Sequence, residues 1–268
     1  MQTEEQIKEM VRSKYSDIAL QTKEQNESSC CGSGCCSTEV YNIMSDDYSE
    51  IKGYNADADL GLGCGLPTEF AKIKKGDVVI DLGSGAGNDA FIARHETGET
   101  GKVIGIDFTP AMIERARKNA ELRGYNNVEF RQGDIEKMPV SSDTVNVVVS
   151  NCVLNLLPNK DGVFREIFRV LKKDGHFSIS DIVLEGELPK EIKEAAEMYA
   201  GCVAGAIQKD IYMGLIKANG FGNITIQKFK PIIVPDDILG AHLSKEAISD
   251  FKTGTSGIFS ITVYAEKI

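Results

Sequence analysis

Strand-like and helix-like patterns of hydrophobic residues alternate through the middle of the chain. From Gly76 onward, the runs typical of buried strands read DVVIDLG, KVIGIDF, NVEFRQGD, TVNVVVSN and GHFSISDIV. Helical periodicity separates most of them, over residues 88–96, 110–124 and 160–175. Strands that alternate with helices predict a parallel sheet with helices on both of its faces.

The two ends of the chain carry different patterns. The hydrophobic positions of residues 3–21 have the spacing of an amphipathic helix. The last third contains two helical segments, at about 189–205 and 208–219, and two strand patterns, NITIQKF and GIFSITVYAEK, which suit an antiparallel addition to the sheet. We therefore expect an α/β fold with a mostly parallel seven-stranded sheet, an amino-terminal helical and cysteine-rich segment and a carboxyl-terminal α+β part.

Charge and hydropathy narrow the possible partners. The chain has 40 acidic and 30 basic residues, and its net charge of -10 repels a phosphate backbone. We therefore expect no nucleic-acid partner. The polar start MQTEEQIKEM lacks the apolar core of a secretion signal, and serine and asparagine interrupt the strongest apolar run, VNVVVSNCVLNLL. These features predict a cytoplasmic protein without a membrane span, and we expect a monomer.

The glycine-rich turn in VVIDLGSGAGNDAFIAR gives the clearest cofactor signal. A strand runs directly into Gly83, Gly85 and Gly87 and then into a helix, whose first N–H groups point outward. The dinucleotide fingerprint would need a further glycine where Asn88 stands. Asp107 closes the next strand, where a carboxylate can accept hydrogen bonds from both hydroxyls of a ribose. Each motif alone is compatible with a plain turn or a surface charge, but the set indicates a nucleoside cofactor.

The order of these motifs, over about residues 76–183, resembles the class I S-adenosylmethionine-dependent methyltransferases, whose fold is Rossmann-like. The resemblance implies that the glycines flank the methionine end of the cofactor, that Asp107 holds the ribose and that the segment GDIEKMP contacts the adenine. It divides the chain into an amino-terminal segment 1–60, a cofactor-binding domain 61–185 and a substrate-covering region 186–268. The implied cofactor-binding set is Asp81, Gly83, Ser84, Gly85, Gly87, Asp107, Phe108, Asp134, Ile135, Glu136 and Asn151.

Seven cysteines form two populations. The stretch CCGSGCC places Cys30, Cys31, Cys35 and Cys36 in a Gly/Ser-rich loop, whereas the other three, Cys64, Cys152 and Cys202, are far apart in sequence. Without a secretion signal, free thiols, metal or metalloid ligands and redox pairs are favoured over a structural disulfide framework. Each isolated cysteine is also compatible with a small buried hydrophobic residue.

The sequence closely resembles the arsenite S-adenosylmethionine methyltransferases. The resembling segments follow the order of that family: CCGSGCC, LGLGCGLP, DLGSGAGNDAFIA, VSNCVLNLLP, VFREIFRVLK, SDIV and YAGCVAGA. In that family cysteine thiolates hold trivalent arsenic, which implies that Cys64, Cys152 and Cys202 are the arsenic ligands here. Soft thiolates suit such a centre better than carboxylate or imidazole does.

The implied reaction is methyl transfer from S-adenosylmethionine to arsenite, in arsenic detoxification. Three thiolates that replace the hydroxyls of arsenous acid leave an arsenic lone pair, which can attack the sulfonium methyl in line. The nucleophile loses no proton, so positioning and exclusion of water supply most of the catalysis. The resemblance also implies reduction by a protein disulfide, with Cys36 and Cys64 as the expected pair and thioredoxin or glutathione as the restoring thiol.

Two other interpretations stay open at this point. A methyltransferase for a small organic acceptor, such as a quinone, would leave Cys152 and Cys202 as packing residues. A zinc- or metalloid-sensing protein would use the CCGSGCC loop as its site, although adjacent cysteine pairs fit a tetrahedral zinc site poorly. The roles of Cys30, Cys31 and Cys35 and of residues 227–257 stay unassigned.

Overall fold

The computed structural model describes residues 3–21, 46–188, 201–234, 244–253 and 256–268, together with 190, 192, 239 and 240. The four cysteines of the CCGSGCC loop, Cys36 among them, lie outside the described residues. Most of the helical segment expected at 189–205 also lies outside them; its described end forms the short helix α8.

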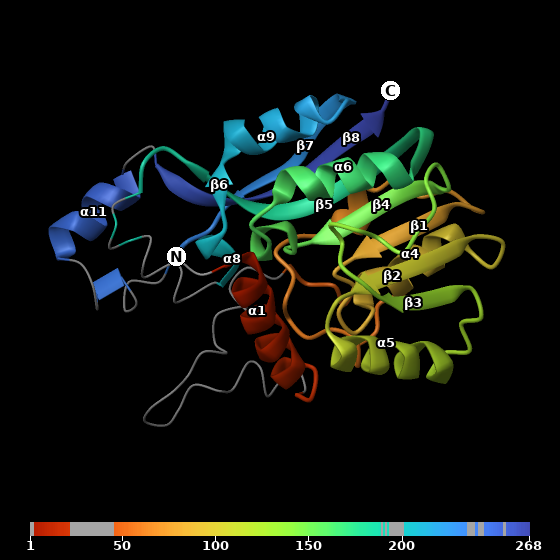
Figure 1. Ribbon diagram of the computed structural model, residues 1–268. Helices are drawn as coiled ribbons and strands as arrows, with labels where there is room; N and C mark the ends of the chain where they lie inside the picture. The colour runs from red at the N-terminus through yellow and green to blue at the C-terminus, as the bar shows by residue number, and fades with distance from the viewer. Residues whose placement is uncertain are drawn as a thin grey trace.

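A single sheet of eight strands runs through the molecule (Figure 1). Its order is β3-β2-β1-β4-β5-β8-β7, and β6 pairs with β5 off this path. The first five strands pair in parallel, whereas β8 runs antiparallel to β5 and β7. The strands are β1 Val78–Leu82, β2 Lys102–Asp107, β3 Val128–Gln132, β4 Val145–Asn151, β5 Leu171–Glu185, β6 Ile207–Gln208, β7 Phe221–Pro231 and β8 Gly257–Lys267.

The predicted α/β class, the mostly parallel sheet and the antiparallel closing pair are confirmed. The strand count of seven is wrong by one, because Ile207–Gln208 pairs with Val183 and Leu184 of β5. A strand of two residues is too short to leave a hydrophobic period in the sequence.

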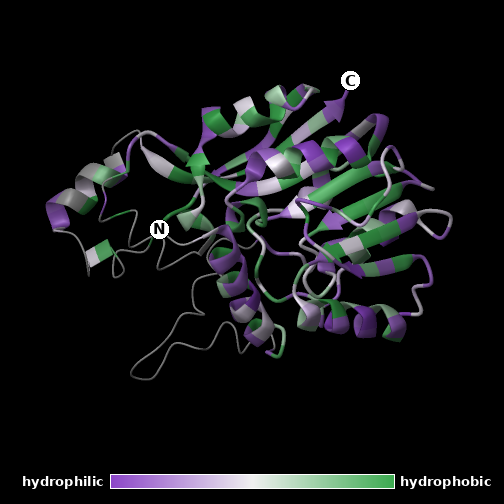
Figure 2. Ribbon diagram, viewed as in Figure 1, coloured by the Kyte–Doolittle hydropathy of each residue, from purple (hydrophilic) through white to green (hydrophobic). Residues whose placement is uncertain are grey.

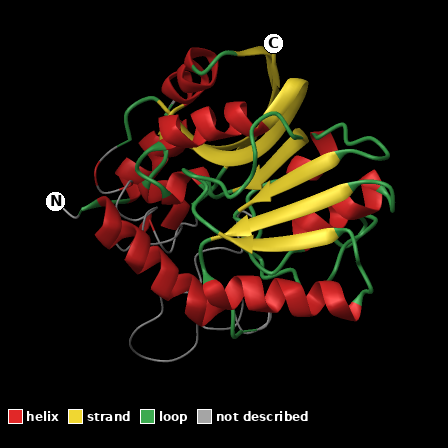
Figure 3. Ribbon diagram, turned by 45° about the vertical axis from the view of Figure 1, so that its right-hand side comes forward, coloured by secondary structure: helices red, strands yellow, loops and turns green. Residues whose placement is uncertain are grey.

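Helices cover both faces of the sheet (Figure 3). Side chains that alternate along each strand divide between two cores: Val79 and Val147 face the core beneath α4 and α5, whereas Ile80 and Val148 face the core beneath α6 and α9. Figure 2 shows the resulting hydrophobic strands between helices with hydrophilic outer faces. The helices are α1 Glu4–Ile18, α3 Pro67–Phe70, α4 Asn88–Thr97, α5 Pro110–Leu122, η1 Leu154–Leu156, α6 Lys160–Val170, α8 Gly201–Ala204, α9 Lys209–Ala218 and α11 Lys245–Thr253. None of the helices in the described part of the chain is both long and apolar enough to cross a membrane.

The helix predicted over residues 160–175 ends five residues early. α6 stops at Val170, and Leu171 has extended backbone angles and begins β5. Leu171 is fully buried and pairs with Val145 of β4, after which the register shifts before His176. Pairing in the sheet therefore overrides the helical propensity of the Leu-Lys-Lys sequence.

The amino-terminal helix α1, predicted over residues 3–21, lies at the carboxyl ends of the parallel strands (Figure 1). Arg115 of α5 donates to the backbone oxygens of Ala19, at 2.9 Å, and Gln21, which anchors the end of α1. Ligands of open α/β sheets bind at this edge of the sheet. Helix α1 is therefore placed to cover a binding site.

Candidate active site

A cavity of about 400 Å³ lies at the carboxyl edge of the parallel strands. The turn after β1, the ends of β2 and β4 and the segment after β3 line it, and α1 closes one side. The structure brings most of the predicted cofactor residues into its lining: Asp81, Gly83, Ser84, Gly85, Asp107, Phe108, Asp134, Ile135 and Asn151. Gly87 and Glu136 were also predicted, but they do not line the cavity.

Two of the glycines are required by the turn itself. Gly83 has a φ of 64°, and a Cβ atom there would lie 2.4 Å from Val153 Cγ2. Gly87, the N-cap of α4, has a φ of 101°, and a Cβ atom there would lie 2.8 Å from the ring of Phe130. Both positions favour glycine because their backbone is left-handed and their neighbours are close.

Asp107 ends β2 and stands at the centre of the lining. Its carboxylate accepts the backbone N–H groups of Gly85, at 3.0 Å, and Thr109, at 2.8 Å. Burial raises the pKa of Asp107, and the two hydrogen bonds partly oppose this shift. A carboxylate offers roughly four lone-pair sites, so acceptor capacity remains for the ribose hydroxyls that the sequence predicts.

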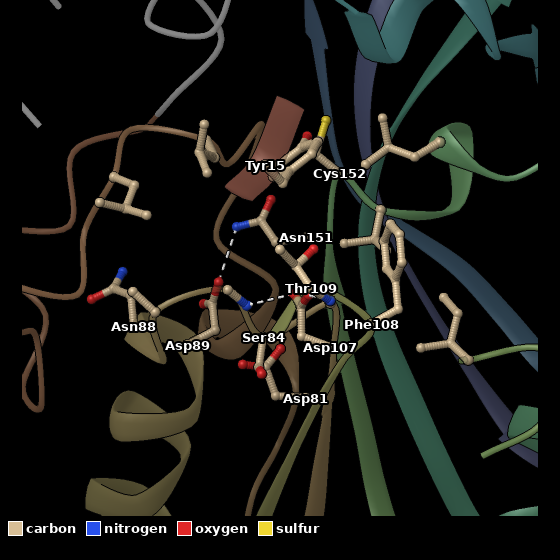
Figure 4. Close-up of a pocket in the computed structure, with 18 of the residues that line it drawn as sticks. Tyr15, Asp81, Ser84, Asn88, Asp89, Asp107, Phe108, Thr109, Asn151 and Cys152 are labelled. Carbon is tan, nitrogen blue, oxygen red and sulfur yellow. Dashed lines mark hydrogen bonds between the residues drawn. The ribbon is translucent and has the colours of Figure 1, made fainter. Parts of the chain in front are cut away.

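The inner end of the cavity is acidic (Figure 4). Burial, together with the charge of Asp89, raises the pKa of Asp81 well above its ordinary value, and burial raises the pKa of Asp89 to about 6. Two buried atoms, Asp81 Oδ2 and Ser84 Oγ, have no hydrogen-bond partner among the described residues. S-adenosylmethionine carries an ammonium group, a sulfonium centre and ribose hydroxyls, so its charges and donors fit this set of acceptors.

Helix α1 closes the other side of the cavity. Lys8 donates to Asp134 at 2.8 Å and also to Glu136, in the segment where adenine is expected. Burial lowers the pKa of Lys8, but its hydrogen bonds to the two carboxylates outweigh burial and raise that pKa. The Arg12 guanidinium lies 5.6 Å from the centre of the Phe108 ring. Sequence analysis did not identify these α1 residues, because the helical period shows which face is buried and not what it contacts.

The three dispersed cysteines meet beside this cavity. Cys64, Cys152 and Cys202 are free and buried. All three belong to one buried cluster, in which the thiols of Cys64 and Cys202 are close enough to shift the pKa of Cys152, and Cys152 lines the cavity. Within the described ranges, no three His, Cys, Asp or Glu side chains are already grouped to hold a metal ion. The structure therefore holds the three thiols in one cluster without grouping them around a single atom.

The backbone of Cys152 is held in an unusual conformation. Its φ of 61° is left-handed, and its N–H donates to Ser180 O at 2.8 Å. The left-handed region costs a non-glycine residue about 1–2 kcal/mol, and strain of this kind is common where a side chain has to be aimed. The turn places the residue that follows β4 in the lining of the cavity.

Burial keeps the three thiols protonated. Burial raises the pKa of Cys64 to about 11. A hydrogen bond from Cys202 lowers the pKa of Cys152, but the bond to Cys64 and burial outweigh it, so this pKa lies well above its ordinary value. The bond to Cys152, together with burial, raises the pKa of Cys202 well above its ordinary value. In this state the site holds neutral thiols.

Three further polar residues, not predicted from the sequence, act on the thiols or line the cavity. Asp181 of β5 is fully buried, accepts a hydrogen bond from the Tyr212 hydroxyl at 3.3 Å and contributes to the raised pKa values of all three cysteines. Tyr48 and Asp89 line the cofactor cavity. Asp89 lies in the first turn of the helix after the glycines, so its position beside the glycine motif could have identified it from the sequence. Tyr48 stands in no motif that could have identified it.

Known proteins resemble the chain over most of its length. A model of the methyltransferase domain family matches residues 73–220. The arsenite methyltransferase of Halobacterium salinarum is 42% identical over 239 residues, covering 83% of this chain and 59% of that protein. The arsenite methyltransferase of Aquipseudomonas alcaligenes is 29% identical, covering 88% of this chain and 68% of that protein. The crystal structure of an arsenic(III) S-adenosylmethionine methyltransferase from Chlamydomonas reinhardtii gives a TM-score of 0.64 at 31% identity, covering 84% of this chain and 72% of that one.

These similarities confirm the class I methyltransferase fold that the motifs predict. The chain spans less than two thirds of the length of the Halobacterium protein. The family model nevertheless covers more than half of the chain, and the Chlamydomonas structure is matched over most of its own length. The chain belongs to the methyltransferase domain family and, within it, to the arsenite methyltransferases.

Proposed function

We propose that this protein transfers a methyl group from S-adenosylmethionine to trivalent arsenic bound by Cys64, Cys152 and Cys202. The proposal rests on one observation: three buried thiols from distant parts of the sequence share one cluster, and one of them, Cys152, lines the cofactor cavity. Three soft ligands are suited to a thiophilic atom and have no evident use for an organic acceptor. The similarity to arsenite methyltransferases supports the same substrate.

The residues of the cavity have distinct proposed roles. When bound, S-adenosylmethionine supplies a methyl group on a positively charged sulfur. Asp107 holds the ribose, the segment that includes Asp134 holds the adenine, and the acidic end formed by Asp81 and Asp89 favours the positive charges. The lining in the described part of the chain contains no histidine, which agrees with a nucleophile that loses no proton.

The protonated thiols suit the capture of a neutral substrate. Arsenous acid has three hydroxyls, and exchange with three thiols forms three As–S bonds and three water molecules. Each thiol proton leaves with a hydroxyl as water, so the buried site gains no charge and avoids the cost of burying an unpaired ion. A divalent metal such as zinc would instead need thiolates and would release protons.

Arsenite binding is expected to release no net protons. Because the thiol pKa values are raised, to about 11 for Cys64, the thiols stay protonated and the affinity for arsenite stays flat between about pH 6 and pH 8. Calorimetric titration in buffers of different ionisation enthalpy checks this with a variant in which Cys30, Cys31, Cys35 and Cys36 are serine. The apparent enthalpy is expected not to depend on the buffer. Uptake of about one proton or more per arsenite would show that thiolates are the resting state, because each departing hydroxyl then takes its proton from the buffer.

Turnover needs a reductant if the arsenic is oxidised as it accepts the methyl group. We propose that Cys36 and Cys64 supply two electrons by forming a disulfide, which thioredoxin or glutathione then reduces. Free buried thiols persist in a reducing compartment, which supports action in the cytoplasm.

The proposed function is tested with labelled S-adenosylmethionine, arsenite and excess thiol, followed by chromatography of the arsenic species. The wild-type protein is expected to form methylated arsenic over many turnovers. The variant with serine in place of the four loop cysteines is expected to stop after about one turnover if the Cys36–Cys64 pair is the reductant. Sustained turnover by this variant would remove the redox role of the loop, and absence of any methylated arsenic from the wild type would remove the function.

A further inference from the structure

The side-chain amide of Asn151 forms hydrogen bonds with the backbone of both Cys64 and Gly65. Asn151 Oδ1 accepts the N–H of Cys64 at 2.9 Å, and Asn151 Nδ2 donates to the carbonyl oxygen of Gly65 at 2.9 Å. The amide orientation is fixed by this pairing, because one partner is a donor and the other an acceptor. Asn151 also precedes Cys152 directly in sequence. One residue therefore links the backbone positions of two of the proposed arsenic ligands.

Tyr48 and Asp89 hold the same amide from the side of the cofactor cavity. Asn151 Nδ2 lies 3.1 Å from Asp89 Oδ2 and also donates to the Tyr48 hydroxyl. The Tyr48 hydroxyl is 2.9 Å from Gly65 O and 3.2 Å from Asp89 Oδ2. Figure 4 shows Asn151 between Asp89 and Cys152. Two amide protons and one hydroxyl proton are thus shared among a carboxylate, a carbonyl oxygen and the hydroxyl oxygen.

The hydrogen-bond network of Asn151, Tyr48 and Asp89 adjoins both the cofactor cavity and the proposed arsenic site. Tyr48, Asp89, Asn151 and Cys152 all line the cofactor cavity. Tyr48 is buried, and Asp89, in the acidic end, has a pKa raised by burial. A cation in the cavity would favour the ionised carboxylate, which accepts hydrogen bonds more strongly than the neutral acid. On the other side of Asn151, the three thiols of the described chain share one cluster but are not grouped around a single atom.

Building on the proposed function, we propose that Asn151 is a positioning residue that sets the placement of Cys64 relative to Cys152. We infer that Tyr48 and Asp89 orient its amide in response to the cofactor. Occupation of the cofactor cavity then favours the arrangement of the thiols that binds arsenic, and bound arsenic favours the arrangement that binds the cofactor. Such coupling is reciprocal: each ligand raises the affinity for the other by the same factor.

The coupling is measured by calorimetry with two probes that do not react together. The probes are arsenite and an analogue of S-adenosylmethionine in which a non-transferable amine replaces the methyl sulfonium. The protein carries serine at the four loop cysteines, so that arsenite binds only at the buried thiols. Each probe is titrated with and without a saturating amount of the other. We expect each to tighten the binding of the other by about fivefold or more.

The variants are chosen to separate positioning from folding. Tyr48→Phe keeps the ring and removes the hydroxyl, and we expect the coupling factor to fall to within about twofold of one, while each probe alone still binds. Asn151→Ala removes the amide and is expected to have the same effect and also to weaken arsenite binding alone. Tyr264→Phe is the matched control: its hydroxyl donates to Glu266 at 2.7 Å, neither residue lines the cavity, and it should keep the wild-type factor. Melting temperatures report any general loss of folding.

The outcomes separate this inference from the proposed function. A coupling factor of one in the otherwise wild-type protein, or a wild-type factor in both Tyr48→Phe and Asn151→Ala, would overturn the positioning role even if arsenite is methylated. Coupling that is lost in both variants would support it even if no methylated product forms. No binding of arsenite at all by the otherwise wild-type protein would overturn both proposals.

Discussion

Replacing Cys152 by serine is expected to abolish the methylation of arsenite. Cys152 belongs to the same buried cluster as the other two cysteines, its pKa is shifted by both of them, and it lines the cofactor cavity. Its loss removes one of three tethered ligands, and tethering contributes a factor of about 100 or more to the binding of a shared partner. A serine hydroxyl has nearly the same shape but is a harder ligand with much weaker affinity for arsenic. We therefore expect the rate with arsenite to fall by about 100-fold or more.

The same Cys152→Ser variant should still bind the cofactor. Calorimetric titration with S-adenosylhomocysteine is expected to give an affinity within about threefold of the wild type, because the residues predicted to hold the adenosine lie elsewhere in the lining. Cys202→Ser serves as the second variant, since Cys202 is a proposed arsenic ligand that does not line the cavity. Full activity in both variants would make the cysteines packing residues and would favour an organic acceptor.

Replacing Asp107 by asparagine is expected to weaken cofactor binding and to leave arsenite binding nearly unchanged. The Asp107 carboxylate ends β2, is buried and retains acceptor capacity beyond its bonds to Gly85 and Thr109. A hydrogen bond to a charged group is worth about 1.5–3 kcal/mol, so loss of the charge should weaken S-adenosylhomocysteine binding by roughly 10- to 100-fold. Asparagine keeps the size of the side chain and one acceptor oxygen, so one of the two backbone bonds is kept while the amide NH2 group faces the other N–H donor.

Arsenite binding separates this effect from misfolding. Asp107→Asn should bind arsenite with nearly the wild-type affinity in the absence of cofactor, because Asp107 has no described hydrogen bond to the cysteine segments. Asp161→Asn is the matched control at an acidic position of α6, away from the cavity, where Asp161 bonds to Arg165 and Asn219. An unchanged cofactor affinity in Asp107→Asn would show that Asp107 does not hold the ribose.

The strands were predictable because each carries a run of hydrophobic residues bounded by polar turns. β1 and β4 are buried on both faces, so their sequences read as continuous apolar segments. The wrong strand and helix boundaries fall where strand pairing decides the structure and no local hydrophobic pattern marks it. Leu171 joins β5 because it pairs with Val145, and the two-residue β6 forms because β5 is there to accept it.

The cofactor turn and the three cysteines were predictable from motifs, whereas their surroundings were not. Gly83 and Asp107 stand at fixed places after β1 and β2, which makes their location a consequence of the topology. Lys8 reaches Asp134 across 126 positions of sequence, and Tyr48 reaches Asn151 across 103. Contacts of that kind leave no periodicity or spacing, because they depend on how separate elements pack.

The measurement that tests the central claim most directly is a single turnover by the protein with serine at the four loop cysteines. Arsenite is bound first at one equivalent, excess is removed, and labelled S-adenosylmethionine is added. If Cys64, Cys152 and Cys202 hold the reacting arsenic, about one labelled methyl group per protein appears on arsenic, and none appears when Cys152 is serine. If the wild-type thiol set binds both ligands but no label reaches arsenic, the buried cysteines are not the site of methyl transfer.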